Sequence, residues 1–417
     1  MASNSPYAEF RTGWPTLLSV TVGSAVGVTA LLFYSLGSFT GSLNAEFGWS
    51  RAQVSSSFLY TTIVLALMAA PLGWMLDRFG PRRVALVSVP GLTITLLLLG
   101  RFDGNLTTFH LLFGLAGLLG AGTTSVVYTK ALNSRFFAKR GMALGISLAG
   151  LGVAALVLPA FVTTIVQPYG WRAGFLALAG LSLLVIPFVF FGFKTDPASP
   201  HAPLQNVGAT RREALRSRTF WMLLAGFLLV GGSVPAIIPH LVPLLTDAGM
   251  APQAAAGIAG LVGLGVILGR LCIGALVDRF HAPFIAAPLF LLTAAGCLLL
   301  LWGGASMAPV AAFMVGLSFG AEADLIAFFC GNYFGLKSYG FIYGLIYAAF
   351  SVAISIGPIW AGAFFDRTGS YDGALITVAV LLAAGSGIVL LLPREQAFAR
   401  NRDMAELPET VRATTQA

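Results

Sequence analysis

Long apolar runs fill most of the chain, and they constrain its fold more than any other feature. Each is at least about 18 residues long, close to the length that a helix needs to cross a bilayer. The 417 residues are 57% hydrophobic and only 10% charged, against about 25% charged in soluble domains. Lipid must therefore solvate part of the surface. The sequence predicts an all-α membrane protein, whose first run is a span rather than a cleaved signal peptide.

Twelve such runs form two groups of six. They cover 14–41, 53–76, 84–101, 107–133, 142–166 and 173–193, and then 219–246, 254–277, 283–303, 307–331, 340–365 and 372–392. Between the groups, 194–218 is rich in proline and arginine, which indicates a linker with a short amphipathic helix at its basic end. We expect a tail over 1–13, six-helix halves over 14–193 and 219–393, the linker 194–218, and a tail over 394–417.

The positions of the basic residues predict the orientation. The net charge of +8 does not indicate nucleic-acid binding, because the basic residues lie in short loops beside apolar runs. Most of these loops fall on one side of the predicted membrane, and cytoplasmic loops carry such an excess. Both termini are therefore predicted to be cytoplasmic. The basic residues predicted on the other side are Arg51, Arg101, Arg172 and Arg367.

The two groups of runs also echo each other in sequence. The segment GWMLDRFGP, which begins at Gly73, matches GALVDRFHAP, which begins at Gly274. Four further residues recur at one constant offset: Gly141, Gly145, Pro159 and Gly174 as Gly340, Gly344, Pro358 and Gly373. Two pseudo-symmetric halves suit a transporter that rocks around a site between them. A membrane enzyme is the alternative, but no acid, base and nucleophile gather near one surface.

The segment GWMLDRFGPRR resembles the loop between helices two and three of the major facilitator superfamily. This likeness, with the twelve runs and the second copy, covers about 12–393. It implies a gating role, in which aspartate–cation pairs hold the halves together in one state and break in another. Alternatively, the arginines only anchor the loop. The motif residues are Gly73, Asp77, Arg78, Gly80, Arg82 and Arg83, with Asp278 and Arg279 in the second copy.

A narrower likeness begins at GRLCIGALVD in the eighth run. It resembles the monocarboxylate transporters and the oxalate:formate antiporters, whose eighth-helix arginine binds the substrate carboxylate and falls on Arg270. Likeness to the antiporters in FYSLGSF, GAGTTSVVY and NYFGLKSYGFIYG, and to their tenth-helix cavity positions, predicts further substrate contacts at Tyr34, Tyr128, Tyr343 and Phe319. The chain departs from both families. Ile346 replaces the antiporters' second cation, and Val266 replaces the aspartate that precedes the monocarboxylate transporters' arginine.

Arg270 is chemically unusual even without this resemblance. It lies eight residues before Asp278, so it is about 12 Å inside the predicted membrane edge. A charge at that depth costs about 2.5 kcal/mol or more, which makes it a candidate functional residue. A planar guanidinium can bind a carboxylate through two parallel hydrogen bonds. The alternative is permanent pairing with an acid at similar depth, either Glu322 or Asp324.

Glu322 and Asp324 are candidates for proton coupling in their own right. They are two residues apart, about 200° around a helix, so they cannot face the same space. Burial disfavours a charged carboxylate, so either could carry a proton with the anion. Glu322 lies nearer the face of Phe319 and Ala323, and is preferred. Alternatively, one or both are static partners of Arg270 or of backbone groups.

Two other polar residues fall inside apolar runs. Lys130 could extend its ammonium group to the membrane surface, or could be a second substrate cation. His240, in PAIIPHLVP, could relay protons or could simply be hydrogen-bonded. The glycines of 260–274, and those of the fifth run, are expected to let helices approach closely.

These observations predict a secondary-active transporter in the inner membrane of a bacterium-like cell. It would carry a small organic monocarboxylate, with a proton, by alternating access. No ATP-binding loop is present, and we expect no cofactor, no metal, no nucleic acid and no obligate protein partner. Three rivals stay open: anion exchange, proton-driven export of lipophilic compounds with Glu322 and Asp324 attracting cations, and a sensor with a transporter fold. The short tails argue against the sensor.

Overall fold

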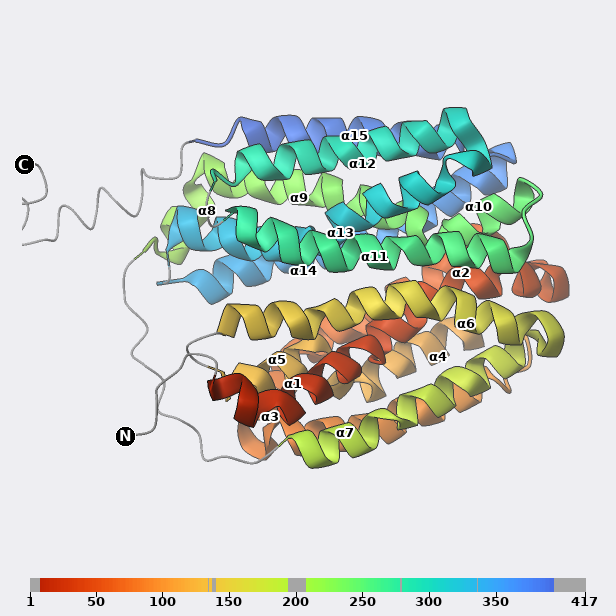
Figure 1. Ribbon diagram of the computed structural model, residues 1–417, viewed down its shortest axis with the longest axis horizontal. Coiled ribbons are helices and arrows are strands. Elements are labelled where there is room, and N and C mark those ends of the chain that lie inside the picture. Colours follow the sequence, from red (N-terminus) through yellow and green to blue (C-terminus); the bar gives the residue numbers. More distant parts are fainter. Residues whose placement is uncertain are drawn as a thin grey trace, which may run out of the picture.

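The computed structural model describes residues 8–133, 135–136, 140–193, 208–277, 280–335 and 337–393. The described chain is helical, apart from its turns and one isolated bridge between Gly208 and Gly335 (Figure 1). The helices of the first part of the chain are α1 (Ala8–Ala25), α2 (Val28–Phe47), α3 (Arg51–Leu99), α4 (Leu106–Leu119), η1 (Ala121–Thr123), α5 (Ser125–Asn133), α6 (Arg140–Leu183) and α7 (Val185–Gly192). Those of the second part are α8 (Arg211–Arg216), α9 (Arg218–Ile237), η2 (Ile238–His240), α10 (Leu241–Asp247), α11 (Pro252–Val277), α12 (Pro283–Gly303), η3 (Gly304–Ser306), α13 (Ala308–Phe334), α14 (Tyr339–Thr368) and α15 (Asp372–Leu390).

Helices cover all twelve predicted apolar runs. Two of these elements each contain two helices, which follow one another directly across a glycine with non-helical backbone angles. These are α3, which turns at Gly80 (φ 74°), and α6, which turns at Gly170 (φ 80°). Both residues lie in the left-handed region, where a side chain would be strained. The predicted short helix at the basic end of the linker is α8; 194–207 lie outside the described residues.

By length and composition, ten segments of the described chain are able to cross a membrane. The longest, Met142–Gly192, has 51 residues and covers two of the predicted runs. The apolar helix α4 is shorter than a full span. The chain is therefore a multi-pass membrane protein. The count of twelve crossings and the cytoplasmic position of the termini stay predictions.

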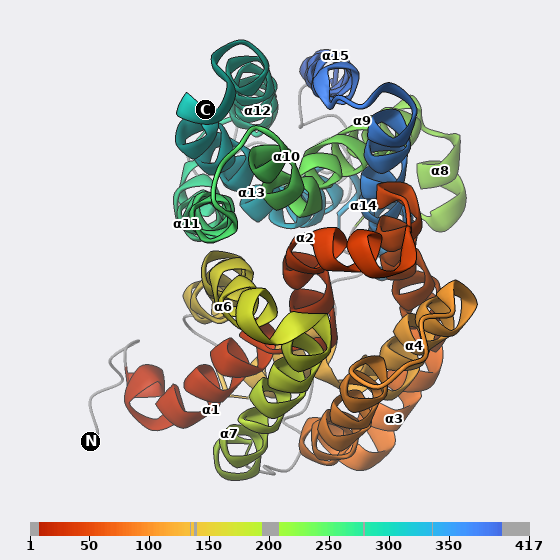
Figure 2. The same ribbon diagram turned by 90° about the vertical axis from the view of Figure 1, so that its right-hand side faces the viewer.

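The helices form two groups that lie side by side along the long axis (Figure 1). We call α1–α7 the N-terminal half and α9–α15 the C-terminal half. Viewed along the helices, α2 and α6 face the C-terminal half (Figure 2). The most extensive contacts between halves join α6 to α11 and α3 to α14. We call the end where α3 begins and α14 ends the distal end, since α1 begins and α15 ends at the other.

Glycine allows the closest approach between the halves. A side chain at Gly263 of α11 would overlap the backbone of Gly152 and Leu156 of α6. On its other side, α11 packs equally closely on α13, where Gly265 and Gly269 meet backbone atoms of the partner helix. These contacts confirm the expected role of the glycines from Gly260 to Gly269 and of Gly152 in the fifth run. In contrast, Gly145 has open space beside it.

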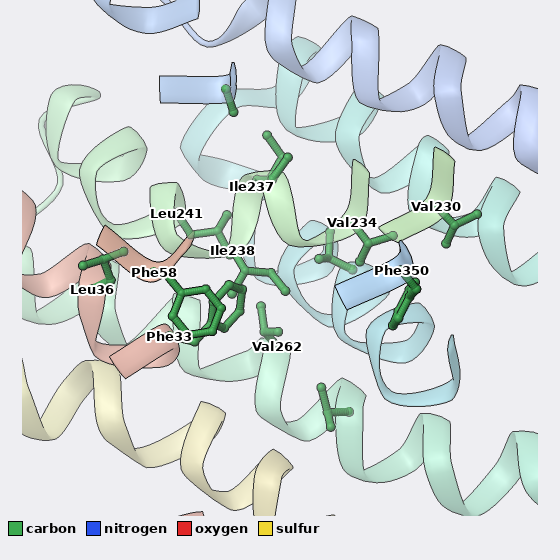
Figure 3. Close-up of a cluster of buried hydrophobic side chains, with 14 of the residues drawn as sticks. Phe33, Leu36, Phe58, Val230, Val234, Ile237, Ile238, Leu241, Val262 and Phe350 are labelled. Atoms are coloured by element: carbon green, nitrogen blue, oxygen red, sulfur yellow. The ribbon is translucent and has the colours of Figure 1, made fainter. Parts of the chain in front are cut away.

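The apolar core continues across the boundary between halves. Phe33 and Phe58 of the N-terminal half pack in one cluster with Ile238 and Val262 of the C-terminal half (Figure 3). All four side chains are almost completely buried. The halves are therefore joined by packed apolar side chains, and this contact positions the residues described next.

Candidate functional site

Arg270 projects from α11, just beyond the glycines that bring this helix against α6 and α13. Its side chain is only 9% exposed. One nitrogen, Nη1, lies 3.4 Å from each carboxylate oxygen of Asp324 on α13. The Nε atom is buried and has no hydrogen-bond partner among the described residues. The predicted acidic partner is therefore present, but its contact leaves part of the guanidinium unused.

The geometry of this pair differs from that of a strong arginine–carboxylate pair. Strong pairs use two nitrogens and N–O distances of about 2.7–2.9 Å, whereas here one nitrogen serves both oxygens at 3.4 Å. A buried guanidinium donor without an acceptor is costly. The arrangement leaves Arg270 able to accept a second anion without first breaking a tight ion pair.

The two carboxyl groups of α13 face different surroundings, as their spacing predicted. The Asp324 side chain is 43% exposed, although it lies deep among protein atoms. The Glu322 side chain is fully buried; its Oε1 accepts a hydrogen bond from Ser318 (3.3 Å), and its Oε2 has no partner. Asp324 is therefore the carboxyl that is exposed beside Arg270, and the preference for Glu322 in proton coupling stays a prediction.

Side chains of α2 cover part of the face of α13 from which Glu322 was preferred. The face of α13 was inferred from Phe319, but Phe319 is itself partly covered, because it stacks on Phe33 (5.9 Å between ring centroids) and meets Tyr34 edge-on (6.5 Å). Phe319, Ala323 and Asp324 are each partly exposed, whereas Glu322 is buried. Sequence spacing fixes the angle between the two acids, but it does not fix how the helix is rotated.

Three of the four predicted aromatic contacts lie around this pair. Tyr34 lies within electrostatic range of both Arg270 and Glu322, and it packs with Phe319. Tyr343 of α14 is within electrostatic range of Asp324 and is stacked between Tyr339 and Tyr347. The structure therefore brings Tyr34, Phe319 and Tyr343 to the surroundings of Arg270 and Asp324.

Tyr128 does not join them. Its side chain is completely buried inside the N-terminal half, against Phe193 and Gly23, and its hydroxyl has no hydrogen-bond partner. Helix η1 precedes α5, the short helix that carries Tyr128. The contact of Tyr128 with substrate stays a prediction. Lys130 lies half-buried in the last turn of the same short helix.

His240 lies at the distal end, in a network that the sequence did not predict in detail. Its side chain is 1% exposed. Because Nε2 lies 2.8 Å from the carbonyl oxygen of Pro358, it must donate there, so in a neutral ring Nδ1 accepts from the Tyr371 hydroxyl at 2.9 Å. Burial raises the pKa of Tyr371 and Arg51 opposes this, so the hydroxyl keeps its proton for this bond. The hydrogen-bonded alternative for His240 thus describes this structure.

The same network joins the two halves through Arg51 at the start of α3. Its guanidinium pairs with Asp247 (2.5 Å) and donates to the Tyr371 hydroxyl (2.7 Å). The carboxylate of Asp366 accepts from the backbone N–H groups of Arg51 (2.9 Å) and Ala52 (3.0 Å), so the C-terminal half caps a helix of the N-terminal half. We call the bonds among Arg51, Asp247, Asp366, Tyr371 and His240 the distal latch.

A cavity of about 450 Å³ lies beside the latch, between the halves. Arg51, Asp247 and Asp366 contribute to its wall, together with polar residues of α2 and α6. Sequence reasoning counted Arg51 only as a basic residue in a loop, and it missed both aspartates. A pattern within the sequence could not have paired residues 51 and 366.

The predicted gating motif lies at the opposite end. Arg78 stacks over Trp74 and Phe79, and Arg82 over Phe190, so both guanidinium groups lie on aromatic rings. Gly73 and Gly80 have open space around them, and Gly80 makes the turn between the two spans of α3. The side chain of Asp77, and both Asp278 and Arg279, lie outside the described residues. Arg83 is exposed.

The chain is similar to known transporters over most of its length. The model of the Major Facilitator Superfamily matches residues 22–358. The chain is similar to monocarboxylate transporter 11 of Homo sapiens (28% identity, 92% of this chain and 83% of the relative). It is also similar to monocarboxylate transporter 13 of Bos taurus (27%, 91% and 89%) and to the probable sulfoacetate transporter SauU of Cupriavidus necator (26%, 82% and 86%).

Among solved structures, the fold is similar to that of a bacterial homologue of the human lysosomal transporter Spinster. In its inward-facing, unoccupied conformation the TM-score is 0.67, at 17% identity, over 90% of this chain and 96% of that one. In its inward-facing, occupied conformation the TM-score is 0.68, at 16% identity, over 94% and 98%. At this identity the likeness concerns the fold alone.

Proposed function

Because the chain belongs to the Major Facilitator Superfamily, and so is a membrane transporter, we propose that it carries a small organic monocarboxylate together with a proton. The observation that carries this proposal is the buried guanidinium of Arg270, which has one long contact to Asp324 and an Nε without a partner. One cation at the site suits one carboxylate. The similarity to monocarboxylate transporters and to a probable sulfoacetate transporter supports a small organic anion.

Asp324 provides the coupling to protons in this proposal. When it is charged, it occupies Nη1 of Arg270 and repels an incoming carboxylate. When it is protonated, it releases the guanidinium to the substrate, so substrate and proton bind together. Glu322, buried beside Tyr34, is a second protonatable group. The acid that precedes the arginine in the monocarboxylate transporters is Val266 here, and Asp324 supplies a carboxylate from a neighbouring helix instead.

Alternating access then means that the halves rock about their α6–α11 and α3–α14 contacts. In this proposal the distal end faces the outside, both termini are cytoplasmic, and the membrane is a bacterial inner membrane. The distal latch closes the outer side in the state described here. In the other state the latch opens, and the loops of the gating motif close the cytoplasmic side.

Binding of acids to the purified protein tests the proposal. A thermal-shift screen in detergent would use lactate, pyruvate, propionate and benzoate at pH 5.5 and pH 7.5. We expect at least one acid to raise the melting temperature, and more so at pH 5.5, because a protonated Asp324 no longer competes. If no acid stabilises the protein, the proposal is wrong.

The Arg270→Ala variant sharpens the test. Truncating one partner of a buried charge pair costs about 2–5 kcal/mol, so affinity for the stabilising acid should fall by about 30-fold or more. Arg270→Lys keeps the charge but loses the planar fork, so its affinity for the acid should lie between those of Arg270→Ala and the wild type. Arg101→Ala, at an exposed position of the distal end, is the matched control. Binding that survives Arg270→Ala would favour the exporter of lipophilic compounds.

A further inference from the structure

Tyr347 belongs to α14, the helix that contacts α3 of the N-terminal half. Farther along α14, the Ser355 hydroxyl donates to the Thr62 hydroxyl of α3 at 2.6 Å. Beyond it, Gly362 packs against the backbone of Ala52. Tyr347 is less covered than Ser355 and Gly362, and 39% of it is exposed.

This exposed surface is not the outer wall of the bundle. Tyr347 lies deep among protein atoms and is within electrostatic range of both Arg270 and Asp324, which belong to α11 and α13. The ring thus lies near the Arg270–Asp324 pair. Tyr347 and the Asp324 side chain are both partly exposed.

Tyr347 is the inner end of a ladder of three tyrosines. The residues are four apart, so they stack along one side of α14, with Tyr343 5.6 Å from Tyr339 and 5.4 Å from Tyr347 between ring centroids. The planes of Tyr339 and Tyr343 are 3° apart, and those of Tyr343 and Tyr347 are 21° apart. A neighbouring tyrosine supports each ring, so Tyr347 is held in place before any ligand arrives.

Apart from the acids Asp324 and Glu322, the described surroundings of Arg270 offer flat aromatic rings. Phe319 and Tyr34 meet edge-on across the boundary between α13 and α2. Ile346, next to Tyr347 in sequence, is 1% exposed and points into the core. A substrate whose carboxylate binds Arg270 would therefore place the rest of its body against aromatic surface.

We propose that Tyr347, supported by Tyr343, forms a ring-binding subsite beside Arg270, and that the substrate class is an aryl monocarboxylate. This inference rests on the proposed function, and it adds the chemistry of the substrate body. Aromatic rings stack in offset or edge-to-face geometry, with a gain beyond their apolar area, so the subsite distinguishes a planar ring from a saturated one. Tyr347 acts here as a specificity-determining residue.

Two acids of similar size separate these chemistries: benzoate and cyclohexanecarboxylate. Kd is measured for both by isothermal titration calorimetry on the full-length protein in nanodiscs. We expect the wild type to bind benzoate about three- to tenfold more tightly, which corresponds to the known gain from an aromatic pair. Tyr347→Leu should remove this preference by weakening benzoate, and Tyr347→Phe should keep it. Tyr169→Leu, at a residue that is 77% exposed near the turn of α6, is the matched control.

The outcomes separate this inference from the proposed function. Equal wild-type affinity for the two acids, or a benzoate preference that survives Tyr347→Leu, would overturn the aryl subsite. If Arg270→Ala weakens the binding of both acids in those cases, carboxylate recognition at Arg270 still stands. If Arg270→Ala weakens the binding of neither acid, the proposed function fails, and the subsite fails with it.

Discussion

The distal latch and the Arg270 site both place charged groups between helices, but they satisfy them differently. In the latch, Arg51 has partners at 2.5 and 2.7 Å, and Asp366 accepts two backbone hydrogen bonds near 3.0 Å. At the centre, Arg270 has one contact partner at 3.4 Å and a donor without an acceptor. A paired network stabilises one arrangement of the halves, whereas an under-paired cation is available to a ligand.

The difference also appears in what each region joins. The latch connects the two halves, so its bonds must break when the distal end opens. The Arg270–Asp324 pair lies within the C-terminal half, on the closely packed helices α11 and α13, so it moves as a unit when the halves rock. We therefore expect latch substitutions to change the equilibrium between conformations, and substitutions at the centre to change affinity.

The largest expected effect on the latch comes from Asp366→Ala. It leaves two N–H groups at the start of α3 without their acceptor, and loss of a helix cap costs about 1–2 kcal/mol. The distal end should open more often. The reporter is Ser355→Cys, a buried position at the α3–α14 contact, in a protein whose natural cysteines are replaced by serine. The measurement is the rate at which an impermeant thiol reagent, added from the distal side, labels this cysteine.

We expect labelling to rise by about five- to thirtyfold. Asp103→Ala is the control, because that exposed carboxylate accepts a hydrogen bond only within its own loop, from Asn105. If Asp366→Ala and the control label Ser355→Cys at the same rate, the latch does not hold the halves together.

A smaller effect is expected from Tyr371→Phe. The change removes the hydroxyl that accepts from Arg51 and donates to His240, and leaves the buried Nδ1 without a donor. A lost hydrogen bond of this kind costs about 1 kcal/mol. The melting temperature should fall, while the affinity for the carboxylate stays that of the wild type. Tyr169→Phe is the control for the substitution itself, and a reduced affinity in Tyr371→Phe would mean that the latch and the centre are not separate.

Asp324→Asn tests the centre with a weaker perturbation. The Asp324 side chain is 43% exposed, so its ion pair is screened and is worth about 0.2–1 kcal/mol. The amide no longer competes for Arg270, so binding of the acid at pH 7.5 should become about two- to fivefold tighter. The difference in affinity between pH 5.5 and pH 7.5 should also shrink. Calorimetry at the two pH values measures both, and weaker binding would show that Asp324 holds the substrate instead of competing with it.

These comparisons also mark what the sequence could predict. Apolar length gave the helices, and the spacing of Gly152, Gly260 and Gly263 indicated where helices meet, because both are local properties of the chain. Arg270 was identified for a similar reason, since a charge inside an apolar run is visible without a structure. The rotation of α13, which exposes Asp324 and buries Glu322, depends on the helices that pack around it. The latch joins residues 315 positions apart, and no local pattern encodes such a pair.

The smallest expected effect comes from Tyr128→Phe, and it tests the rule that the first comparison suggests. The Tyr128 hydroxyl is buried without a partner, as is Nε of Arg270, yet it lies inside the N-terminal half. Removing a neutral group that makes no hydrogen bond should leave stability unchanged or slightly raised, by less than about 1 kcal/mol, and should not affect acid binding. Melting temperature and calorimetry are the measurements. An unpaired neutral hydroxyl, unlike an unpaired cation, exerts no long-range attraction on an anion. A loss of affinity in Tyr128→Phe would therefore mean that this hydroxyl contacts the substrate in another conformation.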